Sequence, residues 1–318
     1  MRIRSLLVAI PAAALLAAAA AAPALAGAWI PAPKDFYSEF SASTLTADIF
    51  HDVNGDRVPL AYGGIREERA FTSTNEFGWK KTVSAVFVVP FASVTRMTAH
   101  DEVNRNATGL GDMTAGLKWK FAGKDHNAIS LEGDWIGPLG YESTVRLTQG
   151  ELDYIDQVLA PGLSPGDSAN YARQVAAPHI GLGNQNLQGV LRIGLTVGSF
   201  SYLDVGGGYR YRYDAPADQI LLSAQYGLWV AKPLLLVGTY SGMISSGSGD
   251  TPADEYTEHL VNVRAVYRVD DRLDVFGGSE NTITAKNGYH KNEIFVGLAM
   301  KQTSLNRLQG LLGGTRHP

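Results

Sequence analysis

The chain has 318 residues, 45% of them hydrophobic, with 27 basic residues, 31 acidic residues and no cysteine. The lack of cysteine excludes a disulfide framework, a thiolate metal site and covalent haem attachment. A net charge of −4 argues against nucleic acid as a partner.

The first 26 residues have the features of a secretory signal peptide. Arg2 and Arg4 precede an apolar run over residues 6–22, and Ala24-Leu25-Ala26 is a cleavage site of the A-x-A kind. We expect export by the general secretory route and cleavage by signal peptidase after Ala26; a retained helical anchor is the alternative. Cleavage takes away two of the 27 basic residues, so that 25 face 31 acidic ones.

The rest of the chain contains about twelve candidate strands, recognised by apolar and polar residues in alternation. In the sequence GLGDMTAGLKWKF from Gly109 to Phe121, apolar and aromatic residues occupy one parity and lysines the other. The candidates lie at residues 35–50, 65–79, 82–93, 109–121, 127–137, 181–197, 201–213, 219–231, 234–244, 256–269, 272–284 and 291–301.

The connections between these strands alternate between short turns and segments that are mostly longer, the longest covering residues 138–180. Short periplasmic turns and longer external loops are typical of a transmembrane antiparallel up-and-down β-barrel, and an even strand count places both termini in the periplasm. We therefore predict an all-β barrel over residues 27–301, embedded in outer-membrane lipid of a Gram-negative cell and inserted by the barrel-assembly machinery. A soluble β-sandwich is the alternative.

Aromatic residues at the strand ends support this prediction. With the barrel topology they fall on the lipid-facing parity and form two girdles at the membrane interfaces. They are Phe77, Trp79, Trp119 and Phe121 at the periplasmic edge and Tyr209, Tyr211 and Tyr213 at the outer edge.

The opposite parity predicts the residues that face the lumen. Their charges, of both signs on adjacent strands, would either form a cross-strand ladder that fills a narrow barrel or line a water-filled pathway. The candidate pore-lining residues are Lys118, Lys120, Glu132, Asp134, Arg192, Asp204, Arg210, Arg212, Glu258, Arg264 and Arg268, and Asp274 shares their parity.

The longest loop contains one candidate helix. Thr148 and Glu151 form a capping box, and apolar residues then recur at helical spacing until Pro161-Gly162. This helix would either lie in the barrel mouth as a hatch with an apolar face toward a ligand, or pack on neighbouring loops. The hatch residues would be Leu152, Tyr154, Ile155 and Leu159.

Asp52, Asn54 and Asp56 imitate the start of a calcium-binding EF-hand loop, but Arg57 and Gly63 stand where a glycine and a bidentate carboxylate are needed. An Asx turn is the favoured interpretation, and calcium the weaker one. The sequence contains no G-x-S-x-G elbow, H-E-x-x-H helix or P-loop, so we predict no enzyme, catalytic residue, cofactor or metal site. A hydrolase assembled only by the barrel fold is the alternative.

The segment 302–318 follows the last strand, although barrels commonly end on an aromatic residue. Leu305, Leu308 and Leu311 or Leu312 would give this tail a short amphipathic helix in the periplasm, with a role in insertion, plugging or contact with another protein.

Three segments carry a resemblance to a known family: GLGDMTAGLKWKF, the sequence GLGNQNLQGVLRIGLTV over residues 181–197, and AWIPAPKDFYSEFSAS from Ala28. They resemble outer-membrane proteins named for the meta-pathway of phenol degradation, loosely over residues 28–301. The resemblance implies a porin-like channel for passive uptake of small hydrophobic or aromatic solutes, without catalytic residues. A closed structural or scaffolding barrel is the alternative.

Overall fold

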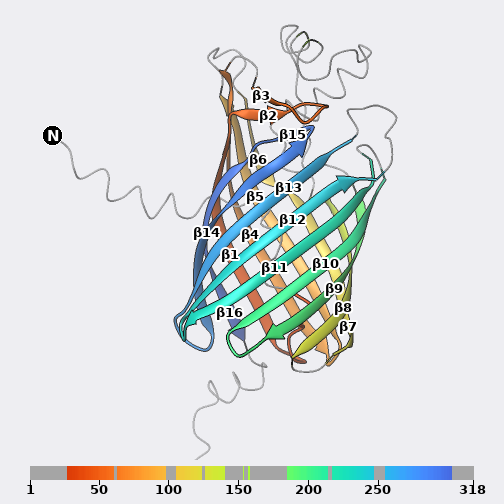
Figure 1. The fold of residues 1–318 in the computed structure, drawn as a ribbon, viewed down its shortest axis with the longest axis vertical. Coiled ribbons are helices and arrows are strands. Elements are labelled where there is room, and N and C mark those ends of the chain that lie inside the picture. Colours follow the sequence, from red (N-terminus) through yellow and green to blue (C-terminus); the bar gives the residue numbers. More distant parts are fainter. Residues whose placement is uncertain are drawn as a thin grey trace, which may run out of the picture.

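The computed structural model describes residues 27–60, 63–97, 105–123, 126–139, 153, 157, 185–213, 217–246 and 255–302. These residues form a closed antiparallel barrel of 12 strands (Figure 1), as the sequence predicted. Among them, no helix is both long enough and apolar enough to cross a membrane. The predicted signal peptide and nearly all of the tail lie outside the described residues.

The strands of the barrel agree with the predicted segments to within a few residues, apart from a later start of the segment predicted at 181. Their bounds are β1 Phe36–Ala47, β4 Ile65–Lys80, β5 Val83–Met97, β6 Arg105–Leu110, β7 Asp112–Ala122, β8 Asn127–Pro138, β9 Asn186–Val197, β10 Ser201–Arg212, β11 Gln219–Ala231, β12 Leu234–Ser245, β13 Thr257–Arg268, β14 Leu273–Lys286 and β16 Asn292–Gln302.

The strands β6 and β7 together form one wall strand, because both pair with β5. They are separated at Gly111, whose N–H donates a hydrogen bond to the carbonyl of Pro90 (2.9 Å). Pro90 has no N–H to continue the ladder, which accounts for the interruption. The barrel closes where β1 pairs with β16 on one side and β4 on the other.

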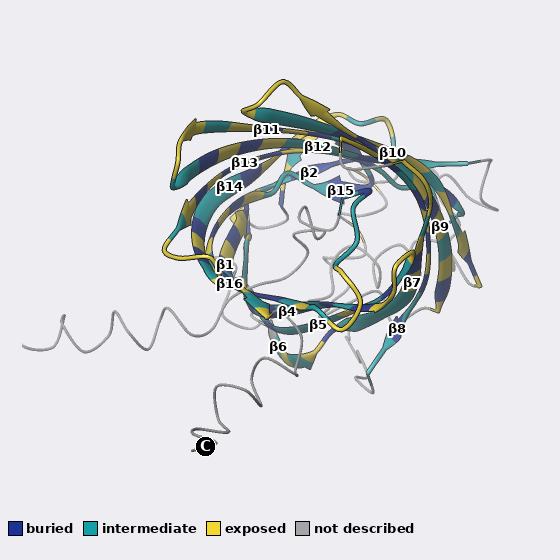
Figure 2. Cartoon of the chain, turned by 90° about the horizontal axis from the view of Figure 1, so that it is seen from below, coloured by how far each residue is buried: buried dark blue, intermediate teal, exposed yellow. Residues whose placement is uncertain are grey.

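The two ends of the barrel differ. One, the turn end, carries the short connections at residues 81–82, 198–200, 232–233 and 269–272. The other, the loop end, carries the long connections, and there a three-stranded sheet of β2 (Ile49–His51), β3 (Arg57–Pro59) and β15 (Gly288–Tyr289) lies over the mouth (Figures 1 and 2). This sheet was not predicted from the sequence, and the first predicted strand, residues 35–50, runs on into β2.

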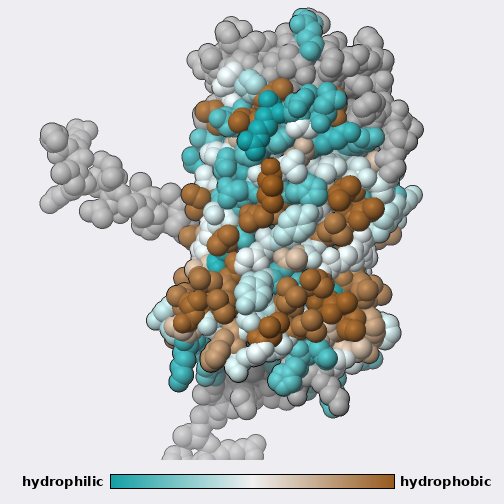
Figure 3. Space-filling view, in the orientation of Figure 1, coloured by the Kyte–Doolittle hydropathy of each residue, from teal (hydrophilic) through white to brown (hydrophobic). Residues whose placement is uncertain are grey.

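The two faces of the wall have opposite character. Buried and exposed residues alternate along the strands (Figure 2), and large apolar side chains gather on the outside, most densely toward the turn end (Figure 3). The aromatic residues predicted for the girdles point outward, with Trp79 59% and Trp119 52% exposed. An apolar outer surface of this extent requires a lipid environment.

Candidate functional site in the barrel interior

The charged residues predicted to face the lumen lie on the inner face of the wall. Lys118, Glu132, Asp134, Asp204, Arg212, Glu258, Arg264 and Asp274 are buried, and Lys120, Arg192, Arg210 and Arg268 are half-buried. A buried charge needs a partner of opposite sign or several hydrogen bonds. That these residues line a conducting path stays a prediction.

The segment 27–34 precedes β1 at the turn end, and its first residues, 27–29, lie inside the barrel, while residues 32–34 are exposed. Ala28 is fully buried, and its N–H donates a hydrogen bond to Asp204 Oδ2 (2.6 Å). Lys118 Nζ donates to the carbonyl of Gly27 (3.2 Å), and the Trp29 ring packs edge-on against Tyr202 (6.1 Å between centroids). We call this segment the N-terminal plug. Sequence reasoning missed it because the segment lacks strand periodicity and its partners come from distant strands.

Ion pairs surround the N-terminal plug. Lys118 Nζ lies 3.2 Å from Glu76 Oε1, with both side chains almost fully buried. Arg192 Nε lies 2.9 Å from Glu132 Oε2, and its Nη1 lies 4.0 Å from Asp204 Oδ1. These contacts join β4 to β7 and β8 to β9 and β10, so charges on different strands are paired at the turn end.

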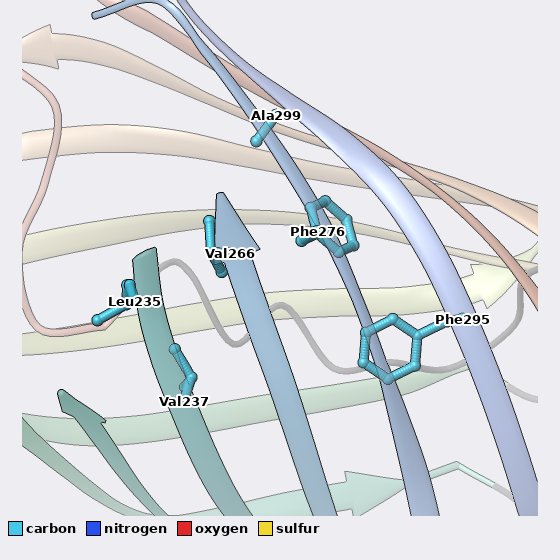
Figure 4. Packing of buried hydrophobic residues seen from close by; sticks show 6 residues of the cluster. All are labelled: Leu235, Val237, Val266, Phe276, Phe295 and Ala299. Atoms are coloured by element: carbon cyan, nitrogen blue, oxygen red, sulfur yellow. The ribbon is translucent and has the colours of Figure 1, made fainter. Parts of the chain in front are cut away.

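An apolar patch interrupts the polar lining on four adjacent strands. Figure 4 shows the six side chains of this patch, which project from β12, β13, β14 and β16, with Tyr37, Tyr202 and Trp229 packed against them. Tyr202 also contacts Trp29, so the patch is continuous with the N-terminal plug. The six residues are Leu235, Val237, Val266, Phe276, Phe295 and Ala299.

Glycines make room for the two phenylalanine rings of the patch. Phe276 pairs with Gly297, and Phe295 pairs with Gly278 on the neighbouring strand. A Cβ atom added at Gly297 would lie 2.3 Å from Phe276 Cζ, and one added at Gly278 would lie 2.7 Å from Phe295 Cζ. Each ring therefore occupies the space that a side chain would fill.

Arginines border the apolar patch. Arg264 Nη1 lies 3.1 Å from Glu39 Oε1, and its guanidinium carbon lies 4.1 Å from the centre of the Phe276 ring. Arg268 stacks over Trp229 (4.6 Å) and lies 3.5 Å from Asp274. A guanidinium over an aromatic face is held by cation–π attraction while its N–H groups stay free for carboxylates.

At the loop end, the half-buried Lys291 forms an ion pair with the buried Glu258, with Lys291 Nζ 2.8 Å from Glu258 Oε1. Burial alone would lower the pKa of Lys291, but the neighbouring Glu258 carboxylate raises this pKa above its ordinary value. Arg210 and Arg212 lie on β10 near this end and contact the amide side chains of Gln188 and Gln219.

Two other predicted features have different outcomes. Leu152, Tyr154, Ile155 and Leu159, the predicted hatch, lie outside the described residues. In the first long connection, Asp52 Oδ1 accepts hydrogen bonds from the N–H groups of Asn54 and Asp56 (both 2.8 Å), which is the Asx turn favoured from the sequence. Within the described part of the chain, no group of three or more His, Cys, Asp or Glu residues is placed to hold a metal.

The closed barrel, apolar outside and charged inside, defines a transmembrane β-barrel of the outer-membrane type. Its fold is similar to that of the COG4313 outer membrane channel from Pseudomonas putida F1, with a TM-score of 0.62 and 12% identity over 86% of this chain and 97% of that chain. The NanC porin gives a TM-score of 0.48 and 6% identity over 83% of this chain and 100% of that chain. The translocator domain of the autotransporter NalP from Neisseria meningitidis gives a TM-score of 0.47 and 8% identity over 85% of this chain and 89% of that chain.

No protein-family model matches the chain, and the search among curated proteins finds no match. The comparisons thus support the outer-membrane barrel fold that the resemblance to the phenol-degradation family implies, and no family model supports that family.

Proposed function

We propose that the protein is an outer-membrane channel for passive entry of small hydrophobic or aromatic solutes, without enzymatic activity. The observation that carries this proposal is the apolar patch on the inner wall, bordered by Arg264 and Arg268. Two phenylalanines and a tryptophan give the inner face apolar surface beside its charged residues. Apolar surface with a few placed polar groups is typical of sites that bind organic ligands.

Two further points support the proposal. The fold is similar to that of a COG4313 protein described as an outer membrane channel. In addition, the outer surface carries exposed apolar side chains around the wall, as a lipid-embedded protein needs. With the barrel embedded in the outer membrane, the turn end faces the periplasm and the loop end faces the outside of the cell.

The N-terminal plug favours one alternative, a closed barrel with a structural or scaffolding role. It holds Asp204 and Lys118 in contacts that narrow the turn end. The two functions differ in one measurable property, since a structural barrel would pass neither ions nor solutes.

Planar-bilayer conductance of the purified, heat-modifiable protein tests the proposal, with a small neutral aromatic such as benzyl alcohol added as a probe. We expect discrete ohmic steps that the probe reduces. Conductance unaffected by the probe would contradict the aromatic class. A silent membrane, together with no uptake of the probe into proteoliposomes, would contradict the channel.

A further inference from the structure

The inward-facing cations of the barrel fall into two groups. Most have a carboxylate within 4.0 Å. Arg210 and Arg212, on the inner face of β10, form no ion pair within the described part of the chain. The same holds for Lys120 at the turn end. The paired cations are Arg66, Lys118, Arg192, Arg264, Arg268, Lys291 and Lys301.

Neutral amides accept the side-chain hydrogen bonds of the two arginines, while the Asp218 carboxylate accepts only from the backbone N–H of Arg212 (2.8 Å). Arg210 Nη1 and Arg212 Nη2 both donate to Gln219 Oε1, at 3.3 and 3.2 Å. Arg210 also donates from Nε and Nη2 to Gln188 Oε1, at 3.0 and 2.8 Å. Asp134 accepts a hydrogen bond from Gln188 Nε2 (2.7 Å) and forms no ion pair with the arginines. Two full positive charges thus share two amide oxygens.

Hydrogen-bond donors are left over at this cluster. The Arg212 residue is 6% exposed, and its Nε and Nη1 are buried without a partner. Gln219 is fully buried, and its Nε2 also lacks a partner. A guanidinium stays protonated in proteins, so this excess of N–H groups cannot be relieved by losing a proton. Within the described residues, no carboxylate accepts a hydrogen bond from either guanidinium, so an acceptor with negative charge would complete the hydrogen bonds of these two groups.

Arg210 is the more exposed of the two arginines. It is half-buried, and one guanidinium nitrogen lies 3.7 Å from Met243 Sδ, while Arg212 is buried. The two neighbouring guanidinium groups add to one positive field. A guanidinium matches a carboxylate with two parallel hydrogen bonds.

We propose that Arg210 and Arg212, with Gln188 and Gln219, form a binding site for the carboxylate group of an organic acid. This inference rests on the proposed function and specifies its solute class: a small acid whose carboxylate binds at the arginines near the loop end and whose apolar body then passes the apolar patch nearer the turn end. The site lies near the loop end, where a solute entering from outside arrives.

Equilibrium binding of benzoate to the detergent-solubilised full-length mature protein tests the site. The neutral benzyl alcohol tests the need for charge, and formate tests the need for the ring. Arg210→Gln and Arg212→Gln should each weaken benzoate binding by roughly tenfold or more, as expected for loss of a charge-assisted hydrogen bond. Benzyl alcohol binding should not change.

Lys120→Gln is the matched control. Like the two arginines, Lys120 is an inward-facing cation without an ion pair among the described residues, but it lies at the opposite end of the barrel. It should leave benzoate binding unchanged. If Lys120→Gln weakened benzoate binding as much as the arginine variants do, the effect would be one of overall charge, and the proposed site would be wrong. A wild-type affinity for benzoate no greater than that for benzyl alcohol would also contradict the site. If Arg212→Gln fails to fold, the half-buried Arg210→Gln decides the result.

Bilayer and proteoliposome measurements separate this inference from the channel proposal. Benzoate binding that depends on Arg210, without transport of either aromatic compound, would retain the site and contradict the channel. Passage of benzyl alcohol without specific benzoate binding would retain the channel and contradict the site.

Discussion

The N–H of Ala28 donates a 2.6 Å hydrogen bond to the carboxylate of Asp204, joining residues 176 positions apart. Asp204 is buried on β10, so this bond holds the N-terminal plug against the inner wall. A buried N–H with a carboxylate acceptor is among the stronger hydrogen bonds in proteins.

Asp204→Asn should loosen the N-terminal plug. The amide oxygen still accepts the bond, but the negative charge that also lies near Arg192 is lost, a change of about 1–2 kcal/mol in the binding of the plug. We expect larger conductance steps and faster proteolysis before residue 35. Asp271→Asn, at an exposed turn, is the control and should match the wild type. Unchanged conductance and proteolysis in Asp204→Asn would show that Asp204 does not hold the plug.

Gly297→Ala should destabilise the barrel. The added Cβ would lie 2.3 Å from Phe276 Cζ and close to the carbonyl of Phe40, so both the ring and the neighbouring backbone must move, at a cost of about 1–3 kcal/mol. Gly238→Ala, where no atom lies within 4 Å, should be nearly neutral. Thermal unfolding followed by heat-modifiable mobility measures both. Equal midpoints would mean that the ring is not confined by Gly297.

Glu39→Gln should be strongly destabilising, because it leaves Arg264 buried without its carboxylate partner, an effect of about 3–5 kcal/mol in a dry interior and less in a wet lumen. Adding Arg264→Met should recover part of this loss, since the unpaired charge is then removed. Chemical unfolding of the two single variants and the double variant gives the coupling free energy. Additive effects would contradict a direct interaction between the two side chains.

The sheet over the mouth should be sensitive to acid. His51 Nδ1 donates to the carbonyl of Gly55 (3.0 Å), so its Nε2 accepts from His290 Nδ1 (3.2 Å). Burial, then the positive charge of Arg57 and repulsion from His51 once it is protonated, lower the pKa of His290 from 6.5, against a smaller opposite effect of Asp48.

A lowered histidine pKa means that the unfolded segment binds a proton more readily than the folded one. The contribution of neutral His290 is therefore complete above the unfolded value of 6.5 and is lost as the pH falls from there through the folded pKa. Hydrogen exchange of β2, β3 and β15, corrected for intrinsic rates, should rise on acidification. His290→Gln should remove this dependence, and His126→Gln, at an exposed turn, should retain it. A pH-independent wild type would refute the prediction.

Ile155→Asp tests the predicted hatch. A charge on its apolar face should reduce uptake of benzyl alcohol while assembly, measured by heat-modifiable mobility, stays intact. Normal uptake by this variant would mean that residue 155 does not face the solute path.

Much of the barrel could be predicted because its signal is local. Alternation of side chains across a strand depends only on neighbouring residues, so the strand positions, the outward aromatics and the inward charges follow from the pattern around Trp119, Lys118 and Tyr211. The interruption at Gly111 was missed because it arises from Pro90 on the partner strand, not from the pattern of either strand.

The sequence by itself therefore determined which residues form the wall, which face lipid and which face inward, because a period of two is set by the geometry of one chain segment. Only the tertiary structure decided which inward residues meet. Arg264 and Glu39 are 225 positions apart and become partners through closure of the sheet, while Arg210 and Arg212 obtain amides instead of carboxylates through the register of β9, β10 and β11. Register and closure depend on the whole barrel, which no short pattern encodes.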